Sequence, residues 1–116
     1  MAELYRIVFE EEWRAIEREG AFRGSAHDAR DGFIHLSAAH QLEGTLATHY
    51  TAKPGLVLLT LDGERLSQSR KGTLKWEVSR GGELFPHFHG EIPASVVTRA
   101  TPLELDANGK HVLPGT

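Results

Sequence analysis

The sequence predicts an α+β protein with two helices in its N-terminal half and a small mixed or antiparallel β-sheet. Two helical patterns occur before residue 51, and short apolar segments separated by turn residues make up most of the remainder. Helices and strands do not alternate regularly, which argues against a parallel α/β fold. A length of 116 residues is typical of one domain, and we expect a single domain over residues 1–116.

The N-terminal segment predicts a short strand followed by a helix. Residues 4–8 (LYRIV) have the composition of a strand. Within residues 10–19, Trp13 and Ile16 are three positions apart and therefore share a helix face. Three glutamates occupy the first turn, where the helix dipole favours negative charge, and Gly20 is a suitable helix terminator.

The next segment predicts a loop, a strand and a second helix. Residues 22–31 (FRGSAHDARD) are polar and show no apolar periodicity, so we expect them to be irregular. Residues 33–36 (FIHL) predict a strand. Residues 38–50 predict a helix with Leu42 and Leu46 on one face, and a Lys-Pro-Gly sequence follows it.

The second half predicts strands. Residues 56–61 (LVLLTL) are almost wholly apolar, which is typical of a central strand buried on both faces. We expect a turn at residues 62–63, a polar loop over residues 68–73, and a strand over residues 74–78 that leads into a glycine-containing loop.

The C-terminal segment predicts an extended segment, a strand and a hairpin. Residues 85–89 should be extended, and Pro86 argues for an edge position or an irregular start because proline cannot donate a ladder hydrogen bond. Residues 96–100 predict a strand, and residues 103–112 predict a hairpin around an Asn-Gly turn.

Composition excludes several classes of function. The net charge of −3 and pI of about 6.1 do not suit a duplex nucleic acid partner. The absence of cysteine excludes disulfides, thiolate metal sites and cysteine nucleophiles, and suits a cytoplasmic protein. Neither a signal peptide nor an apolar run long enough to span a membrane is present, so we expect no membrane partner. The seven histidines are numerous for this length.

The segment GFIHLS, residues 32–37, carries the first candidate functional residue. Side chains alternate along a strand, so Ile34 and Leu36 should enter the core while His35 and Ser37 point to the opposite side. Ser37 precedes the second helix and is best explained as its N-cap, with a ligand contact as the alternative. His35 lies at a strand end beside a helix N-terminus, where free N–H groups favour anions. We expect His35 to be functional, against the alternative of a histidine fixed in the core by backbone hydrogen bonds.

A second histidine pair occurs in the segment ELFPHFHG. If this segment is extended, His87 and His89 share one face. Together with His35 they could supply three metal ligands, although Pro86 disturbs the pattern. The alternative is that one histidine is buried in a hydrogen bond and the other is solvated. The remaining histidines of the chain show no distinguishing pattern, although His27 and His49 could line a pocket.

The segment LKWEVSRGG combines a strand with an arginine in a glycine loop. Trp76 and Val78 should face the core, whereas Glu77 should face the other side. Arg80 has the planar donor geometry that suits phosphate or carboxylate, and Arg23 lies in the earlier polar segment. The alternative is a structural ion pair between Glu77 and one of these arginines.

These segments resemble a known family. The sequences DGFIHLS, LKWE, SRGGELFPH and a later Ile-Pro pair are similar to those of domain-of-unknown-function family 952, a family of small bacterial proteins, and the resemblance covers nearly the whole chain. That family resembles a compact form of the ADP-ribosyltransferase fold, which also includes RNA 2′-phosphotransferases. The resemblance implies a split β-sheet around a cleft for NAD or a related nucleotide.

The resemblance transfers to individual residues only in part. His35 with Ser37 is similar to the His-Gly-Ser/Thr motif that holds a ribose in ADP-ribosyltransferases. No tyrosine occurs on a matching strand, and the position six residues before Pro93, where that fold carries a glutamate, is His87. The phosphotransferase branch lacks the glutamate and uses arginines and a histidine, a pattern that Arg80 and His35 suit better.

Three functions follow as hypotheses. The first is an enzyme that acts on a nucleotide, NAD-like or ribosyl-phosphate ligand. The second is a non-catalytic module that binds a nucleotide or anion, and the third is a metal-dependent enzyme that uses the histidines. We favour a nucleotide-like small molecule as ligand, with NAD or a relative as the candidate cofactor and without a bound metal. The expected catalytic residues are His35, Glu77 and His87. The expected ligand-binding residues are Arg23, Ser37, Trp76, Arg80 and His89.

Overall fold

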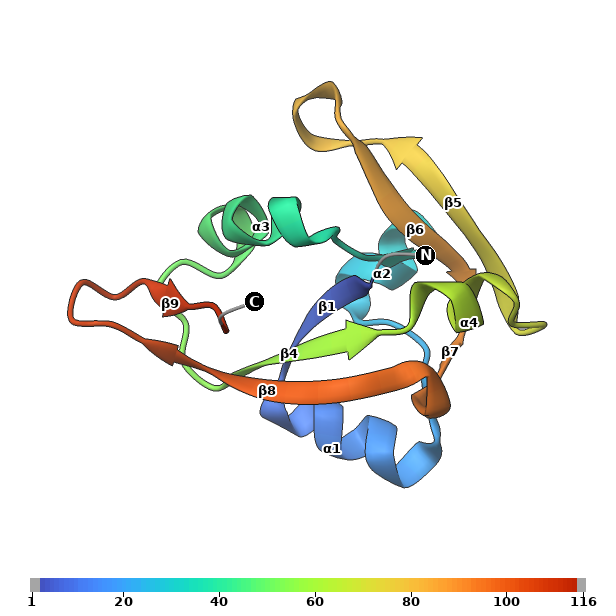
Figure 1. Cartoon of the computed structure of the whole chain (residues 1–116), viewed down its shortest axis with the longest axis horizontal. Coiled ribbons are helices and arrows are strands. Elements are labelled where there is room, and N and C mark those ends of the chain that lie inside the picture. Colours follow the sequence, from blue (N-terminus) through green and yellow to red (C-terminus); the bar gives the residue numbers. More distant parts are fainter. Residues whose placement is uncertain (1–2, 115–116) are drawn as a thin grey trace.

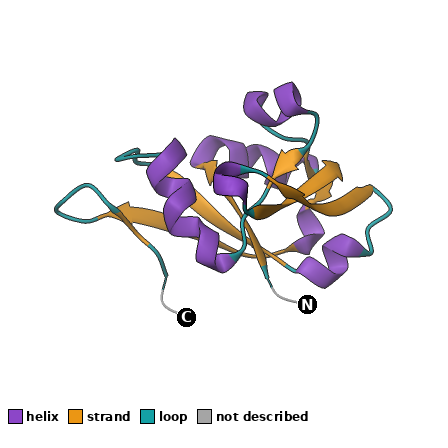
Figure 2. Ribbon diagram, turned by 90° about the horizontal axis from the view of Figure 1, so that it is seen from above, coloured by secondary structure: helices purple, strands orange, loops and turns teal. Residues whose placement is uncertain are grey.

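The computed structural model describes residues 3–114, and a four-stranded antiparallel sheet lies at its centre (Figure 1). The strand order is β1-β4-β8-β9. The strands are β1 (Leu4–Phe9), β4 (Leu56–Leu61), β8 (Val97–Leu105) and β9 (His111–Val112). The hairpin of β8 and β9 projects from the body of the molecule in both views (Figures 1 and 2). The predicted α+β class and the terminal hairpin are confirmed.

Strand β4 is buried along its whole length because both faces of the sheet are covered. Alternate residues enter two different apolar clusters, with Leu59 in one and Leu58 in the other. Helix α1 (Glu10–Glu19) packs against the first cluster through Ile16, and α3 (Leu42–His49) packs against the second through Leu46. The periodicity seen in the sequence therefore identified the buried faces of both helices.

A second sheet carries most of the candidate residues. It contains β3 (Ile34–His35), β6 (Leu84–Gly90) and β5 (Gly72–Val78) in the order β3-β6-β5. Two backbone hydrogen bonds between Tyr5 and Ser37, both 2.9 Å, connect it to the first sheet at β1. Ile34 and Phe88 anchor the second sheet in the first apolar cluster.

Short elements complete the chain. A two-stranded ladder pairs β2 (Ala21–Phe22) with β7 (Ile92–Pro93). The remaining elements are α2 (Ala26–Asp31), α4 (Gly63–Ser67), and the 3-10 turns Ala39–Gln41, Arg80–Gly82 and Ala94–Val96. No helix among residues 3–114 has the length and apolar character required to cross a membrane.

Two local predictions were wrong, and one short helix was not predicted. Residues 26–31 form α2 within the segment expected to be irregular, and α4 follows the expected turn at Asp62. Ser37 is not a helix cap: the helical segment starts one residue later, and the Gln41 side chain accepts the hydrogen bond of the Ala38 N–H at 2.9 Å. The Ser37 hydroxyl instead lies 3.0 Å from that of Thr45.

Strand β6 is central in its sheet, whereas Pro86 favoured an edge position or an irregular start. Pro86 lies opposite Leu36, and the Leu36 N–H donates to the Pro86 carbonyl at 3.0 Å. The reciprocal hydrogen bond, from residue 86 to Leu36, cannot form because proline has no N–H. Strand β3 ends at His35, the residue before Leu36. Proline is therefore accommodated in a central strand at the point where the neighbouring ladder stops.

The side-chain orientation predicted for β5 was also wrong. Trp76 is 47% exposed and Val78 is 68% exposed, so neither enters the core. Strand β5 is the outer strand of its sheet, and only Leu74 of the alternating set packs against the apolar cluster.

Candidate functional site

A pocket of about 320 Å³ lies where the two sheets meet. Its wall is formed by strand β1, helices α2 and α3, the end of β3, the turn after β5, and strand β6. The lining combines imidazoles, hydroxyl groups and the guanidinium of Arg80 with the apolar surfaces of Ile7, Leu36 and Phe85. Such a mixture of a few polar groups in a partly apolar wall is typical of small-molecule sites.

One end of the pocket is organised by Asp28, which is 2% exposed. Its Oδ1 accepts hydrogen bonds from Arg6 Nη1 at 2.8 Å, His35 Nδ1 at 2.7 Å and the His35 backbone N–H at 2.9 Å. Burial raises the pKa of Asp28, but the hydrogen bonds from His35 and Arg6 outweigh burial and hold that pKa well below its ordinary range. Asp28 is thus an ionised anchor for both neighbours.

The imidazole of His35 is held at both nitrogens. Nδ1 donates to Asp28, and Nε2 lies 2.8 Å from Asp31 Oδ2. The ring also packs against those of His27 and Phe33, with centroids 4.3 and 4.7 Å away. The orientation of His35 is consequently fixed before any ligand arrives.

A second carboxylate–imidazole group lies on the β5–β6 pair. Glu77 Oε1 is 2.9 Å from His87 Nδ1 and 2.8 Å from His89 Nε2. Phe33 stacks on the His87 ring with centroids 4.1 Å apart. Burial lowers the pKa of His87 despite the opposing hydrogen bond from Glu77, so the ring is neutral at pH 7.

The second ring nitrogen of His87, Nε2, has no protein partner among the described residues. In those residues, every fully buried side-chain nitrogen has a hydrogen-bond partner. The atom must therefore retain some accessible surface, and His87 lines the pocket. With Nδ1 donating to Glu77, Nε2 of the neutral ring carries a lone pair that can accept a proton.

Arg80 provides a positive charge in the wall that has no direct ion pair among the described residues. Its guanidinium lies over the Phe85 ring at 4.8 Å, and no carboxylate of residues 3–114 lies within ion-pair distance of it. A Cβ at Gly44 would lie 3.0 Å from Arg80 Nη2, so the glycine leaves room for the side chain beside α3. Burial, followed by the charges of His27 and Arg80, lowers the pKa of His49.

The structure brings together some of the predicted site residues and separates others. His35, Ser37, Arg80 and His87 line the pocket. Glu77 and His89 lie behind His87, and Glu77 pairs with these two histidines in place of an arginine.

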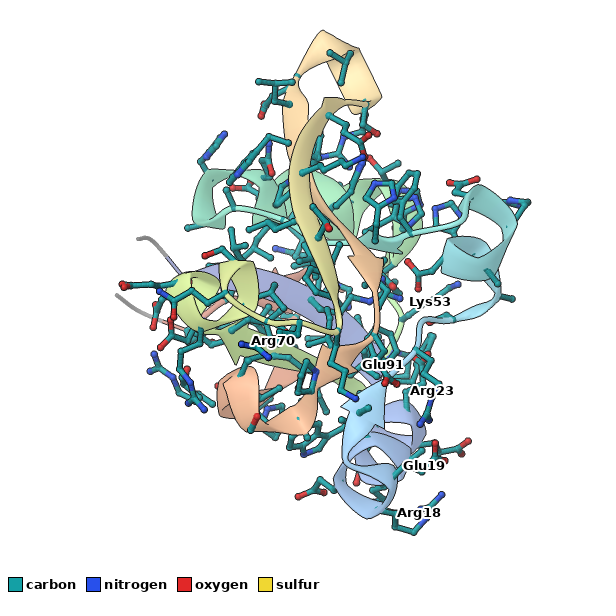
Figure 3. The ribbon with its side chains drawn as sticks, turned by 90° about the vertical axis from the view of Figure 1, so that its right-hand side faces the viewer. Arg18, Glu19, Arg23, Lys53, Arg70 and Glu91 are labelled. Atoms are coloured by element: carbon teal, nitrogen blue, oxygen red, sulfur yellow. The ribbon has the colours of Figure 1, made fainter. Side chains whose placement is uncertain are left out.

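Besides His89, two other predicted ligand residues lie outside the pocket. Trp76 is exposed on β5 and does not line it. Arg23 pairs with Glu19 and Glu91, both at 3.1 Å, and Figure 3 shows these three side chains together at the α1 end of the molecule.

Five charged or imidazole residues of the pocket region were not singled out from the sequence: Arg6, His27, Asp28, Asp31 and His49. His27, Asp28 and Asp31 lie on α2, and Arg6 is the buried arginine that binds α2 through Asp28. The pattern Ser25-x-x-Asp28 was an available signal, because Ser25 N–H donates to Asp28 Oδ2 at 2.7 Å in the manner of a capping box.

Three potential metal ligands cluster at the pocket rim. Ligand atoms of His27, Asp31 and His35 all lie within 4.8 Å of one another, and this is the one such group among residues 3–114. The set His35, His87 and His89 considered from the sequence does not meet the same criterion.

The fold and pocket define the chain as a small α+β protein with a histidine-rich pocket between its two sheets. Residues 7–100 match the family described as "Protein of unknown function (DUF952)", and the chain belongs to that family. No protein with a curated description matches the chain.

Solved structures of one bacterial relative agree with the fold. The crystal structure of protein CC0527 from Caulobacter crescentus has a TM-score of 0.86 and 43% identity, with 96% of this chain and 94% of that chain covered. The solution NMR structure of CC0527 has a TM-score of 0.81 and 44% identity, with 95% and 91% covered.

Proposed function

We propose that the pocket binds a small phosphorylated ligand of the nucleotide, NAD-like or ribosyl-phosphate class. The observation that carries this proposal is Arg80, a guanidinium that lines the pocket without a carboxylate partner among the described residues. Arg6, the other arginine in the wall, is already neutralised by Asp28. Arginine binds phosphate through paired N–H donors, so Arg80 is the natural anion contact.

The rest of the lining supports a sugar phosphate over a simple anion. Hydroxyl groups of Tyr5, Ser37 and Thr45 lie in the wall and can exchange hydrogen bonds with sugar hydroxyls. The aromatic surfaces of Tyr50 and Phe85 offer stacking area to a base or ring. The volume of about 320 Å³ is at the lower end of the range for small-molecule sites, roughly 300–1,000 Å³.

The ribosyl part of the proposal rests on the resemblance of His35 and Ser37 to the ribose-binding motif of the ADP-ribosyltransferase fold. Both residues line the pocket, which is consistent with that role. The glutamate of that fold has His87 in its place, so the chemistry would follow the phosphotransferase pattern of a histidine and an arginine. His87 Nε2 would then accept the proton of an attacking hydroxyl.

Binding is tested by isothermal titration calorimetry with four phosphorylated ligands: ADP-ribose, NAD, AMP and ribose 5-phosphate. Ribose, which lacks a phosphate, is the control ligand. EDTA is present throughout. Arg80→Gln should weaken binding of the phosphorylated ligands by about tenfold or more, equivalent to about 1.4 kcal/mol. Arg23→Gln is the matched control, because it removes the same charge at Glu19 and Glu91, away from the pocket.

Equal affinities of the two variants, or no binding of any phosphorylated ligand, would contradict the proposal. Turnover separates an enzyme from the alternative, a module that only binds. For an enzyme, release of nicotinamide or phosphate should disappear in His87→Gln while binding persists. For a binding module, the wild type binds without releasing either product.

A further inference from the structure

We propose that His27, Asp31 and His35 form a binding site for a divalent transition-metal ion at the rim of the pocket. This proposal does not depend on the phosphorylated ligand, and it uses a different ligand set from the His-x-His pair of β6. The sequence spacing is His-x3-Asp-x3-His. The first two residues are one turn apart on α2 and the third lies on β3.

The distances suit a shared cation. Two ligand atoms, each about 2.0–2.1 Å from a tetrahedral metal, lie about 3.3 Å apart. Here His35 Nε2 is 2.8 Å and His27 Nε2 is 4.0 Å from Asp31 Oδ2. The side chains of His27 and Asp31 are on the surface and can rotate by the small amount that equal distances require.

Asp28 supplies the support that metal-binding histidines normally have. Metal-bound imidazoles usually donate their other N–H to a carboxylate, which fixes the tautomer and the ring orientation. His35 Nδ1 donates to Asp28 at 2.7 Å, and Arg6 and Ser25 hold that carboxylate in turn. His35 Nε2 therefore faces Asp31 Oδ2 at 2.8 Å, so that both atoms can contact one metal ion.

The ligand chemistry selects the type of ion. Two imidazoles and one carboxylate favour zinc or another first-row transition metal over magnesium or calcium, which prefer oxygen ligands. Three protein ligands leave at least one coordination position open. All three residues line the pocket, so that position is available to a pocket ligand.

Arg30 is the group that a metal would displace. Its guanidinium lies 2.6 Å from His27 Nδ1 and 3.9 Å from Asp31 Oδ1. The Arg30 side chain is 71% exposed, so it can move into solvent at little cost. Metal binding through His27 Nε2 would shift the ring proton to Nδ1, which cannot accept a hydrogen bond from Arg30.

The test uses Co²⁺ as a spectroscopic probe on the tag-free, metal-free full chain. The wild type should bind one Co²⁺ per chain, give visible d–d absorption bands, and release the ion to Zn²⁺. His27→Ala and Asp31→Asn should each weaken Co²⁺ binding by about 10–100-fold or more, since even supporting residues of metal sites have effects of that size. Urea unfolding of each variant should match the wild type, because both side chains are at the surface.

Two controls separate this site from other histidine groups. His40→Ala removes an exposed imidazole beside Glu83, and His89→Ala removes one from the Glu77 group. Both should bind Co²⁺ like the wild type. Absence of saturable Co²⁺ binding, or binding that survives both His27→Ala and Asp31→Asn, would overturn the proposal. Arg80→Gln should keep Co²⁺ binding, so failure of the phosphorylated-ligand proposal is recognised separately.

Discussion

Around the pocket, carboxylates determine what each histidine can do. Asp28 and Asp31 hold the two nitrogens of His35, and Glu77 holds His87 and His89. A carboxylate at one ring nitrogen decides which nitrogen is left for a ligand. This leaves His87 Nε2 without a carboxylate partner among the described residues, while the ring of His35 is held in one orientation.

The buried imidazole of His87 should make stability depend on pH. Its pKa is lowered in the folded protein by burial, opposed by Glu77 and assisted by the charges of His35 and His89. The imidazole in the unfolded chain has its ordinary pKa of 6.5. Below that pH it therefore binds a proton more readily than the imidazole in the folded protein does. This contribution to stability is complete above about pH 6.5 and is lost as the pH falls toward the folded-state pKa. His49 contributes with the same sign.

Urea unfolding between pH 7.5 and pH 5 in EDTA measures this effect. The free energy of unfolding should fall toward pH 5 in the wild type and fall less in His87→Gln, which cannot titrate. His111→Gln removes an imidazole from the exposed terminal hairpin and serves as the control. A His87→Gln variant with the same pH dependence as the wild type would show that His87 is not responsible.

At the scale of the elements, close backbone packing positions the β5–β6 pair that holds Glu77, His87 and His89. A Cβ at Gly90 would lie 2.2 Å from the Lys71 carbonyl oxygen, and the Gly90 φ of 149° is itself unfavourable for other residues. Gly90→Ala should therefore lower the free energy of unfolding by about 2 kcal/mol or more, measured by urea denaturation.

Gly109→Ala is the matched control for that substitution. Gly109 also has a positive φ, 78°, but a Cβ there would meet only the Ala52 side chain at 3.8 Å. It should cost about 1 kcal/mol, the backbone strain alone. Similar losses in the two variants would mean that β5 and β6 can separate to admit a methyl group.

Elements with strong apolar periodicity were predictable, and those held by polar contacts were not. Ile16 and Leu46 identified the buried faces of α1 and α3 because burial of an apolar face leaves a periodic pattern. Helix α2 has no apolar face: it is held by Asp28, whose partner Arg6 is 22 positions away in the chain. Such a contact leaves no local pattern, so the rim of the pocket was missed although His35 was identified.

For the whole molecule, the pocket lies between two sheets that share one apolar cluster. Phe88 of β6 is fully buried in the same cluster as Val8 of β1 and Leu59 of β4. The site therefore cannot be taken apart without exposing the core of the central sheet. We expect the two sheets to unfold in one cooperative transition.

The two tryptophans test this cooperativity because each reports on a different sheet. Trp13 of α1 packs against the shared cluster, and Trp76 of β5 is half-exposed on the second sheet. Fluorescence of Trp76→Phe follows the core, and fluorescence of Trp13→Phe follows the β5–β6 pair. In each variant the fluorescence transition should have the same urea midpoint as the far-UV circular dichroism transition. If fluorescence of Trp13→Phe changes at lower urea than its circular dichroism, the β5–β6 pair unfolds separately. The Glu77–His87 side of the pocket could then open without unfolding the central sheet.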